Sequence, residues 1–348
     1  MRNINVSISI FKALPKGGAL NFNLTKTKAD STILLYKMTT KQLIFSFRKE
    51  FLSMSNLFIA IKGKFLPLIL AVMMTLGVYS PAKIEISSAP EKGENTVRVV
   101  SFNLRCNDDI YGFVENRGKF VSAALKNYEP DSFGVQEATV KWLSILDTAL
   151  GKKYDRVGLG RDNSKKTEYS AVYYRKDKFD LLDSGTIWLS ETPERFASKS
   201  FLASMPRICT WATLKNKKTG AVYTHVNTHL DFLLEYTRSR QADVLLSKIE
   251  ELKEHGPLVC TGDFNADEKT ETYEKMTASL TDSRLIAKQT EGGKTYHNYG
   301  RGDALHSSAI DIIFVSDGIE VERYKIIKDT VDNMYLSDHY GLMADICF

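Results

Sequence analysis

An aspartate and an asparagine directly follow a short apolar stretch in the second half of this sequence. Residues 258–261 read Leu-Val-Cys-Thr, which is typical of a buried strand, and Gly262 then allows a tight turn. Because side chains alternate along an extended chain, Asp263 and Asn265 can lie on one side, away from Phe264. A carboxylate and an amide in that arrangement could hold a water or a metal ion. The alternative is an Asp/Asn turn that bonds only its own backbone.

Further polar residues occur within or at the ends of apolar, strand-like stretches. Together with the first two they are Asn103, Glu137, Glu168, His229, Asp263, Asn265, Asp311, Asp338 and His339. Carboxylates are rarely buried without a partner, so the set predicts a bound cation or a charged site. Oxygen ligands suit the hard cations Mg²⁺, Mn²⁺ and Ca²⁺, and histidines beside carboxylates suit acid–base chemistry. Taken singly, each residue has a structural alternative, such as a loop cap, a surface ion pair or a core histidine.

Sequence patterns of several other chemistries are missing. The chain has no Gly-x-Ser-x-Gly elbow, no Rossmann glycine fingerprint and no phosphate-binding loop. Its cysteines, Cys106, Cys209, Cys260 and Cys347, lack CxxC or zinc spacing, and we expect isolated thiols. The sequence therefore offers no support for a serine hydrolase, a dinucleotide enzyme or a structural zinc site.

The elements that must position the polar residues alternate between strand and helix at first and are mainly strands later. The predicted strands cover 97–104, 132–136, 168–175, 179–189, 207–215, 221–228, 258–261, 309–315, 319–327 and 340–346, and the predicted helices cover 116–128, 139–150, 236–254 and 272–280. Asn116 is predicted to cap the first helix. This order predicts an α/β (α+β) fold in which two sheets pack together with helices outside.

Length and charge suit a globular protein and do not demand a nucleic-acid partner. The chain has 348 residues, of which 43% are hydrophobic and 26% charged, enough for one large domain or two ordinary ones. Its net charge of +5 permits an anionic substrate, whereas a DNA-binding surface requires clustered Lys and Arg.

An apolar run near the front of the chain has the pattern of an export signal. Residues 65–78 are mostly apolar, Lys62 and Lys64 precede them, and small residues follow. The run is shorter than the roughly 20 residues that span a bilayer, although an uncleaved anchor is an alternative. We therefore predict export to the periplasm or the extracellular space. The predicted segments are 1–53 as a misassigned extension, 54–82 as the signal peptide, 83–95 as a linker and 96–348 as the folded domain.

Six short motifs occur in an order that resembles one known superfamily. They are Ser-Phe-Asn-Leu (101–104), Gly-Val-Gln-Glu (134–137), Asn-Thr-His-Leu-Asp (227–231), Thr-Gly-Asp-Phe-Asn (261–265), Ala-Ile-Asp-Ile-Ile-Phe (309–314) and Leu-Ser-Asp-His-Tyr (336–340). The series resembles the endonuclease/exonuclease/phosphatase superfamily, which includes DNase I, abasic-site endonucleases and bacterial sphingomyelinases. The resemblance covers residues 97–348 and implies a four-layer α/β sandwich, with two mostly antiparallel sheets packed together and flanked by helices.

The resemblance implies a metal site and a water-activating residue. Glu137 resembles the principal metal ligand, and Asn103 and Asp338 resemble its neighbours in the metal site. Asp263 resembles the residue that orients or deprotonates the attacking water, with Asn265 beside it.

The resemblance also implies a set of phosphate contacts. His229 and His339 resemble the two histidines that contact the scissile phosphate. Asp311 would hold His339, and Glu168 would hold His229. Arg207 is found where the family places a phosphate-contacting arginine, with a structural salt bridge as the alternative.

The expected activity is divalent-metal-dependent hydrolysis of a phosphoester by in-line attack of an activated water, with Mg²⁺, Mn²⁺ or Ca²⁺ as the cofactor. Long basic runs are missing, so we expect a small or short phosphorylated substrate. Trp188 could stack on a base or sugar of that substrate, or belong to the core. A secreted nuclease, a catalytically inactive binding module of the same fold and a sphingomyelinase are the alternatives. We expect a monomer whose mature chain is not inserted in a membrane.

Overall fold

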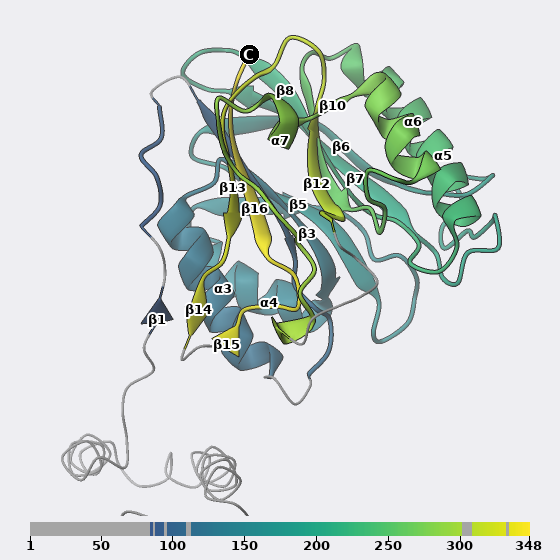
Figure 1. Cartoon of the computed structure of the whole chain (residues 1–348), viewed down its shortest axis with the longest axis horizontal. Helices are drawn as coiled ribbons and strands as arrows, with labels where there is room; N and C mark the ends of the chain where they lie inside the picture. Colours follow the sequence, from purple (N-terminus) through teal and green to yellow (C-terminus); the bar gives the residue numbers. More distant parts are fainter. Residues whose placement is uncertain (1–83, 86–87, 94–95, 109–112, 301–307, 332–333) are drawn as a thin grey trace, which may run out of the picture. The chain divides into compact units, whose positions relative to one another are not determined.

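Two β-sheets lie face to face in the described part of the chain, and helices cover their outer sides (Figure 1). The computed structural model describes residues 84–348 except 86–87, 94–95, 109–112, 301–307 and 332–333. The predicted extension and signal peptide lie outside the described residues. The predicted sandwich of two sheets flanked by helices is confirmed.

The first sheet has seven strands and contains both the first and the last long strand of the domain. Its strands in spatial order are β11 (Gln289–Glu291), β13 (Glu320–Ile327), β16 (Gly341–Cys347), β2 (Val97–Asn103), β3 (Ser132–Thr139), β5 (Glu168–Arg175) and β4 (Tyr154–Val157). Neighbours are antiparallel except for two parallel pairs, β11 with β13 and β2 with β3. In the second of these pairs Asn103 lies opposite Gln136, so β2 and β3 run toward the same edge.

The second sheet has six strands and is also mainly antiparallel. Its strands in spatial order are β10 (Thr281–Asp282), β12 (Asp311–Val315), β9 (Leu258–Asp263), β8 (Val222–His229), β7 (Ile208–Asn216) and β6 (Phe179–Trp188). Only β8 and β9 are parallel in this sheet, and they place His229 opposite Asp263. A small third sheet contains β1 (Ile84–Glu85), β14 (Thr330–Val331) and β15 (Met334–Tyr335).

Helices cover the outer face of each large sheet. Those on the first sheet are α3 (Val114–Tyr128) and α4 (Val140–Leu150), those on the second are α5 (Glu235–Lys253) and α6 (Glu271–Ser279), and two short turns are α7 (Ser283–Ile286) and η1 (Asn298–Gly300). The predicted cap of the first helix was wrong by one turn. Helix α3 begins at Val114, whose N–H donates to Asp108 Oδ1, and Asn116 lies inside its first turn. The carboxylate that accepts the first N–H of the helix therefore belongs to Asp108, eight residues before the predicted cap Asn116.

Three apolar clusters fill the spaces between the four layers. One packs α3 and α4 on the first sheet, one lies between the two sheets, and one packs α5 and α6 on the second sheet. Strand β2 is buried along its whole length because both faces of its sheet are covered. The layers therefore hold the central strands in fixed positions, and this also fixes the residues at the ends of the strands.

The space between the sheets becomes polar toward the edge where β2, β8 and β9 end. Gln136 Nε2 donates to Asn227 Oδ1 at 2.7 Å and to Ser101 Oγ at 3.1 Å. Thr261 Oγ1 donates to the same Asn227 oxygen at 3.0 Å. Glycine is required at position 134, because a Cβ on Gly134 would lie 2.3 Å from Thr261 Oγ1. We call Ser101, Gln136, Asn227 and Thr261 the polar layer. Three of them lie two residues before a predicted site residue, on the same face of its strand.

His225 lies below the polar layer and couples stability to pH. Its Nδ1 lies 2.7 Å from Ser132 Oγ and its Nε2 lies 2.9 Å from Thr261 Oγ1. Burial lowers the pKa of His225 from 6.5 to about 3. Between these values the unfolded chain binds one more proton than the folded protein. Stability that is complete above the unfolded pKa is therefore lost as the pH falls through this window.

The substitution His225→Gln is expected to flatten the dependence of stability on pH. Between about pH 6 and pH 4 the free energy of unfolding should fall more steeply in the wild type, by about 1.4 kcal/mol per pH unit. Urea unfolding at several pH values measures the two slopes. Equal slopes would show that His225 accepts a proton without leaving its buried position.

The described part of the predicted linker packs against the domain. Ile84–Glu85 pairs with β14, and Lys92 Nζ lies 2.6 Å from Asp131 Oδ2. The carbonyl of Pro90 accepts a hydrogen bond from Arg98 Nη2 at 2.9 Å. These residues are therefore part of the domain rather than a free tether. Across the described ranges, none of the helices is long and apolar enough to cross a membrane.

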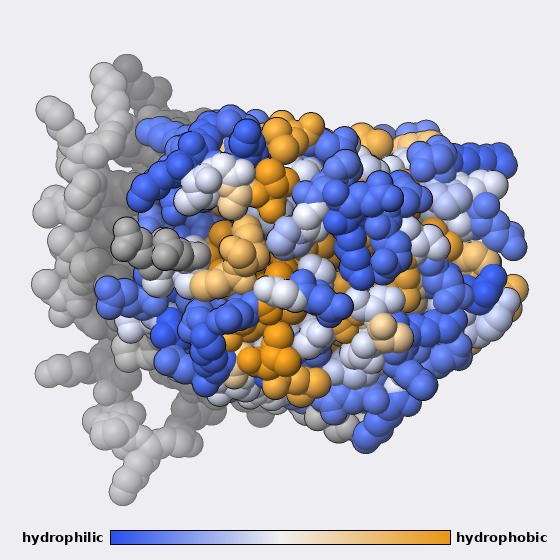
Figure 2. All heavy atoms as spheres, turned by 90° about the horizontal axis from the view of Figure 1, so that it is seen from above, coloured by the Kyte–Doolittle hydropathy of each residue, from blue (hydrophilic) through white to orange (hydrophobic). Residues whose placement is uncertain are grey.

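The end of the sandwich that carries the C-terminus has apolar surface. Figure 2 looks down on this end and shows an apolar group among polar side chains. Exposed apolar residues here include Phe348 at the C-terminus and Leu285 and Ile286 on α7. Strand β16 runs from Gly341 to this end, so His339, which precedes the strand, lies at the opposite end.

Candidate active site

Polar residues from both sheets meet at the edge opposite the C-terminus. Asn103 and Glu137 come from β2 and β3 of the first sheet, where the strands are parallel. His229 and Asp263 end β8 and β9 of the second sheet and lie opposite each other. Asp311 begins the antiparallel strand β12 and pairs with Asp263. Sheet register alone therefore explains why residues far apart in the sequence become neighbours.

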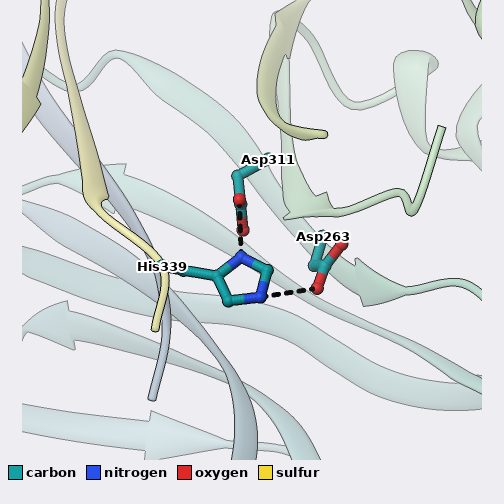
Figure 3. A group of neighbouring side chains, drawn as sticks. All are labelled: Asp263, Asp311 and His339. Carbon is teal, nitrogen blue, oxygen red and sulfur yellow. Dashed lines mark hydrogen bonds and ion pairs between the residues drawn. The ribbon is translucent and has the colours of Figure 1, made fainter. Parts of the chain in front are cut away.

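Asp311, His339 and Asp263 form a line of buried side chains (Figure 3). His339 Nδ1 lies 2.8 Å from Asp311 Oδ2, a hydrogen bond that orients the ring. The other ring nitrogen, Nε2, faces Asp263 Oδ2 at 3.8 Å. His229 Nε2 lies 3.5 Å from the same Asp263 oxygen. Both histidines thus face one carboxylate.

The electrostatic environment gives the two histidines different charge states. Burial alone would lower the pKa of His339, but Asp311 and Asp263 outweigh it and raise this pKa to about 10. Burial lowers the pKa of His229 well below its ordinary value, and the Arg207 guanidinium lowers it further. Burial and the neighbouring Asp311 carboxylate raise the pKa of Asp263 to about 7. Near neutral pH the site has one charged histidine, one neutral histidine and a carboxylate that can accept a proton.

Asn103 joins this line to Glu137. Its Nδ2 donates to Asp263 Oδ2 at 2.8 Å and to Glu137 Oε1 at 3.2 Å. The N–H of Cys106 donates to Glu137 Oε2 at 2.9 Å. Glu137 has a left-handed backbone with φ 55°, at a point where the pairing of β3 with β5 shifts register. Such bulges re-aim side chains beside active sites.

Two groups of side chains could hold a divalent ion. One contains Glu137, Asp338 and Asn103. Burial and the nearby Glu137 carboxylate raise the pKa of Asp338, although His339 acts in the opposite direction. Two carboxylates and an amide are the oxygen donors that hard cations prefer. The other group is Asp263, Asp311 and His339, whose ligand atoms lie within 4.8 Å of one another.

A small pocket opens beside these groups. Its lining residues are Glu137, Arg161, Glu168, Tyr169, Ser170, Arg207, Ile208 and His229. Arg207 is 5% exposed, and within the described ranges its guanidinium makes no hydrogen bond or ion pair. Burial and the neighbouring Arg161 lower the pKa of Arg207. Because a buried charge without a partner is costly, this pocket is suited to an anion.

A family model supports the resemblance seen in the motifs. The model described as the endonuclease/exonuclease/phosphatase family matches residues 100–339. The chain belongs to this family. The family and its solved structures are phosphoester-cleaving hydrolases, and the matched range contains every site residue named so far.

Solved structures of family members share the fold. An endonuclease/exonuclease/phosphatase from Bacteroides vulgatus is 34% identical, with a TM-score of 0.68 over 73% of this chain and 99% of that one. A mannosyl-6-phosphatase from Bacteroides thetaiotaomicron is 32% identical, with a TM-score of 0.65 over 72% of this chain and 100% of that one. Nocturnin from Xenopus laevis is 23% identical over 263 residues, which are 67% of this chain. The chain spans 65% of the length of that relative.

Two sequence-predicted roles differ from what the structure shows. Both oxygens of Glu168 accept hydrogen bonds from Arg161 at 2.8 Å, and among the described residues no hydrogen bond joins Glu168 to His229. The Trp188 ring is 3% exposed, and its indole N–H donates to the Arg161 carbonyl at 2.8 Å. A buried ring cannot stack on a substrate, so Trp188 supports Arg161 instead. The core alternative for Trp188 therefore holds.

Asn265 acts on the site through Asp263. Its backbone is left-handed with φ 50°, and its N–H donates to Asp263 Oδ1 at 3.0 Å. Its side-chain amide donates to the carbonyl of Leu230 at 3.2 Å, just beyond β8. Asn265 therefore forms the predicted Asp/Asn turn and also has a role in the site, because the turn holds the Asp263 carboxylate in place.

Sequence reasoning missed two residues near the site. Arg161 comes from the loop between β4 and β5, where no periodic pattern singles it out. Asp231 completes the motif that contains His229, and its Oδ2 accepts from the N–H and Oγ of Ser204, three residues before Arg207. The sequence could have indicated Asp231, because it is the last residue of the motif Asn-Thr-His-Leu-Asp (227–231).

Proposed function

We propose that the protein is a divalent-metal-dependent hydrolase that cleaves a phosphoester in a small or short phosphorylated substrate. The observation that carries the proposal is the buried guanidinium of Arg207, which makes no hydrogen bond or ion pair with the described residues. It shares one pocket with neutral His229 and with Glu137, and Asp263 lies 3.5 Å from that histidine. An anion that binds Arg207 is thereby placed beside a proton acceptor and a group of oxygen ligands.

The phosphate contacts come from three cationic or donor side chains. Arg207 compensates the negative charge of the bound phosphate and can donate more than one hydrogen bond. His229 is neutral and donates from one ring nitrogen. His339 is charged and is held by Asp311, so it stabilises negative charge that develops during the reaction.

Asp263 is suited to accept the proton of the attacking water. Its pKa of about 7 lets it take a proton near neutral pH, where a general base contributes about 10²–10⁴-fold to the rate. The N–H of Asn265 and the amide of Asn103 hold its two oxygens in place. As the water oxygen bonds to phosphorus, the bond from phosphorus to the leaving oxygen breaks.

Glu137, Asp338 and Asn103 would hold the divalent ion. The alternative group is less suitable, because an ion bound there would occupy Asp263, the proposed proton acceptor, or displace the 2.8 Å hydrogen bond between Asp311 and His339 Nδ1. Mg²⁺, Mn²⁺ or Ca²⁺ bound by the first group would neutralise a phosphate oxygen and stabilise the leaving oxygen. Family membership supports a divalent requirement, and the oxygen-rich donor set supports a hard cation.

A small substrate is supported by two observations. The pocket is small, and eight residues line it. A relative at 32% identity is named a mannosyl-6-phosphatase, and this name indicates a small phosphorylated substrate for that protein.

Chelation tests the proposal directly. Hydrolysis of p-nitrophenyl phosphate and bis-p-nitrophenyl phosphate should fall at least about 100-fold with EDTA and return with excess Mg²⁺. Initial rates of nitrophenolate release measure both. Faster cleavage of plasmid DNA than of either ester would favour a nuclease. No turnover of any substrate with Mg²⁺, Mn²⁺ or Ca²⁺ would favour a binding module.

A further inference from the structure

Arg161 and Glu168 form a rigid, flat ion pair on the wall of the pocket. Arg161 Nη1 and Nη2 each lie 2.8 Å from a different oxygen of Glu168. Their side chains are 13% and 16% exposed. The backbone fixes the pair as well, since the N–H of Arg161 donates to the Glu168 carbonyl at 3.0 Å and Trp188 holds the Arg161 carbonyl. The pair is therefore presented in one orientation.

The pair is next to the phosphate position. Arg161 and Glu168 line the same pocket as Arg207 and His229, with Tyr169 between Glu168 and the rest of β5. A phosphate bound by Arg207 brings its organic substituent within the same small space. The wall that the substituent meets is charged and polar, apart from the ring of Tyr169.

The chemistry of the pair matches neighbouring hydroxyl groups. Each carboxylate oxygen of Glu168 has a lone pair left after bonding Arg161, and each of the two terminal guanidinium nitrogens keeps a second N–H. Each side of the pair thus offers one donor beside one acceptor. A hydroxyl group both donates and accepts, so two adjacent hydroxyls can bond both members of the pair. Because the pair is neutral overall, it does not compete with Arg207 for the phosphate.

We propose that Arg161 and Glu168 are specificity-determining residues that bind the hydroxyl groups of a sugar or polyol phosphate. This inference rests on the proposed function of the same pocket. It assigns the pair to the leaving group and leaves the phosphate to Arg207 and the histidines. It also replaces the role in which Glu168 orients His229.

The test compares a substrate with hydroxyls to one without them. The readout is the ratio of kcat/KM for mannose 6-phosphate to kcat/KM for phenyl phosphate, both followed by phosphate release. Any effect on chemistry common to both substrates cancels in this ratio. The wild type should favour the sugar phosphate, and Glu168→Gln and Arg161→Gln should each lower the ratio by about 10- to 100-fold, as loss of hydrogen bonds to charged groups predicts.

The same strand supplies a matched control. Arg175, at the far end of β5, forms an equally close two-point pair with Asp177, at 2.7 Å and 2.6 Å. Asp177→Asn should leave the ratio at the wild-type value. Hydrolysis of both substrates without preference, or a preference that survives in both pocket variants, would overturn this inference alone. Failure to hydrolyse either substrate with any divalent ion would overturn the proposed function with it.

Discussion

Asp263→Asn is expected to lower kcat by about 10²–10⁴-fold while the fold is retained. The substitution keeps the size of the side chain and an acceptor for the N–H of Asn265, but it removes the group that takes the proton from water. Burial and Asp311 make the charged form of Asp263 unfavourable, whereas the new amide nitrogen can no longer accept the hydrogen bond of Asn103, so the melting temperature should change little. Initial-rate kinetics and thermal unfolding measure the two quantities.

Asp267→Asn makes the same chemical change one turn further along the chain. The side chain of Asp267 accepts the N–H of Lys269 in that turn. Its kcat should equal that of the wild type. If Asp263→Asn kept a kcat close to the wild-type value, another group would have to act as the base.

Glu137→Gln is expected to raise the Mg²⁺ concentration needed for half-maximal activity by at least about 10- to 100-fold, the range for residues that only support a metal ligand. A neutral amide is a weaker ligand for a hard cation than a carboxylate. The hydrogen bond from Cys106 can be kept by the amide oxygen, which favours an intact loop. Activity against Mg²⁺ concentration and calorimetric titration of the ion provide independent measurements.

Glu129→Gln is the matched control for this effect. Glu129 pairs with Lys153 on the surface, beyond the end of α3, and both side chains are more than half exposed. Its Mg²⁺ dependence should be that of the wild type. An unchanged Mg²⁺ requirement in Glu137→Gln would move the ion to the group of Asp263, Asp311 and His339.

Much of the site geometry could be predicted because its signals are local. Apolar runs predicted strands, and a polar residue at the end of such a run predicted a side chain at the edge of a sheet where the strands end. Parallel pairing then brings such ends together, as it does for His229 and Asp263. The structure brings seven of the predicted residues close to one another through direct contacts or mutual electrostatic effects: Asn103, Glu137, His229, Asp263, Asp311, Asp338 and His339.

The remaining features depend on contacts between distant segments. Glu168 begins β5 and is near His229 in the pocket, but Arg161 from an irregular loop takes both of its oxygens. Trp188 is buried because its indole N–H meets a carbonyl from the same loop. The charge states of the two histidines depend on Arg207, just before β7, and on Asp311 in β12. No pattern within a single stretch contains this information.

The polar layer beneath the site has a consequence for how the protein loses activity. Apolar side chains can shift past one another and stay in contact, whereas hydrogen bonds require a defined distance and direction. The bonds of Asn227 with Gln136 and Thr261 therefore fix how the two sheets are aligned. Urea weakens apolar packing and amide hydrogen bonds alike, but a small shift between the sheets is enough to break the directional bonds. Inactivation is therefore expected to precede global denaturation, because the two sheets lose their alignment while most secondary structure survives.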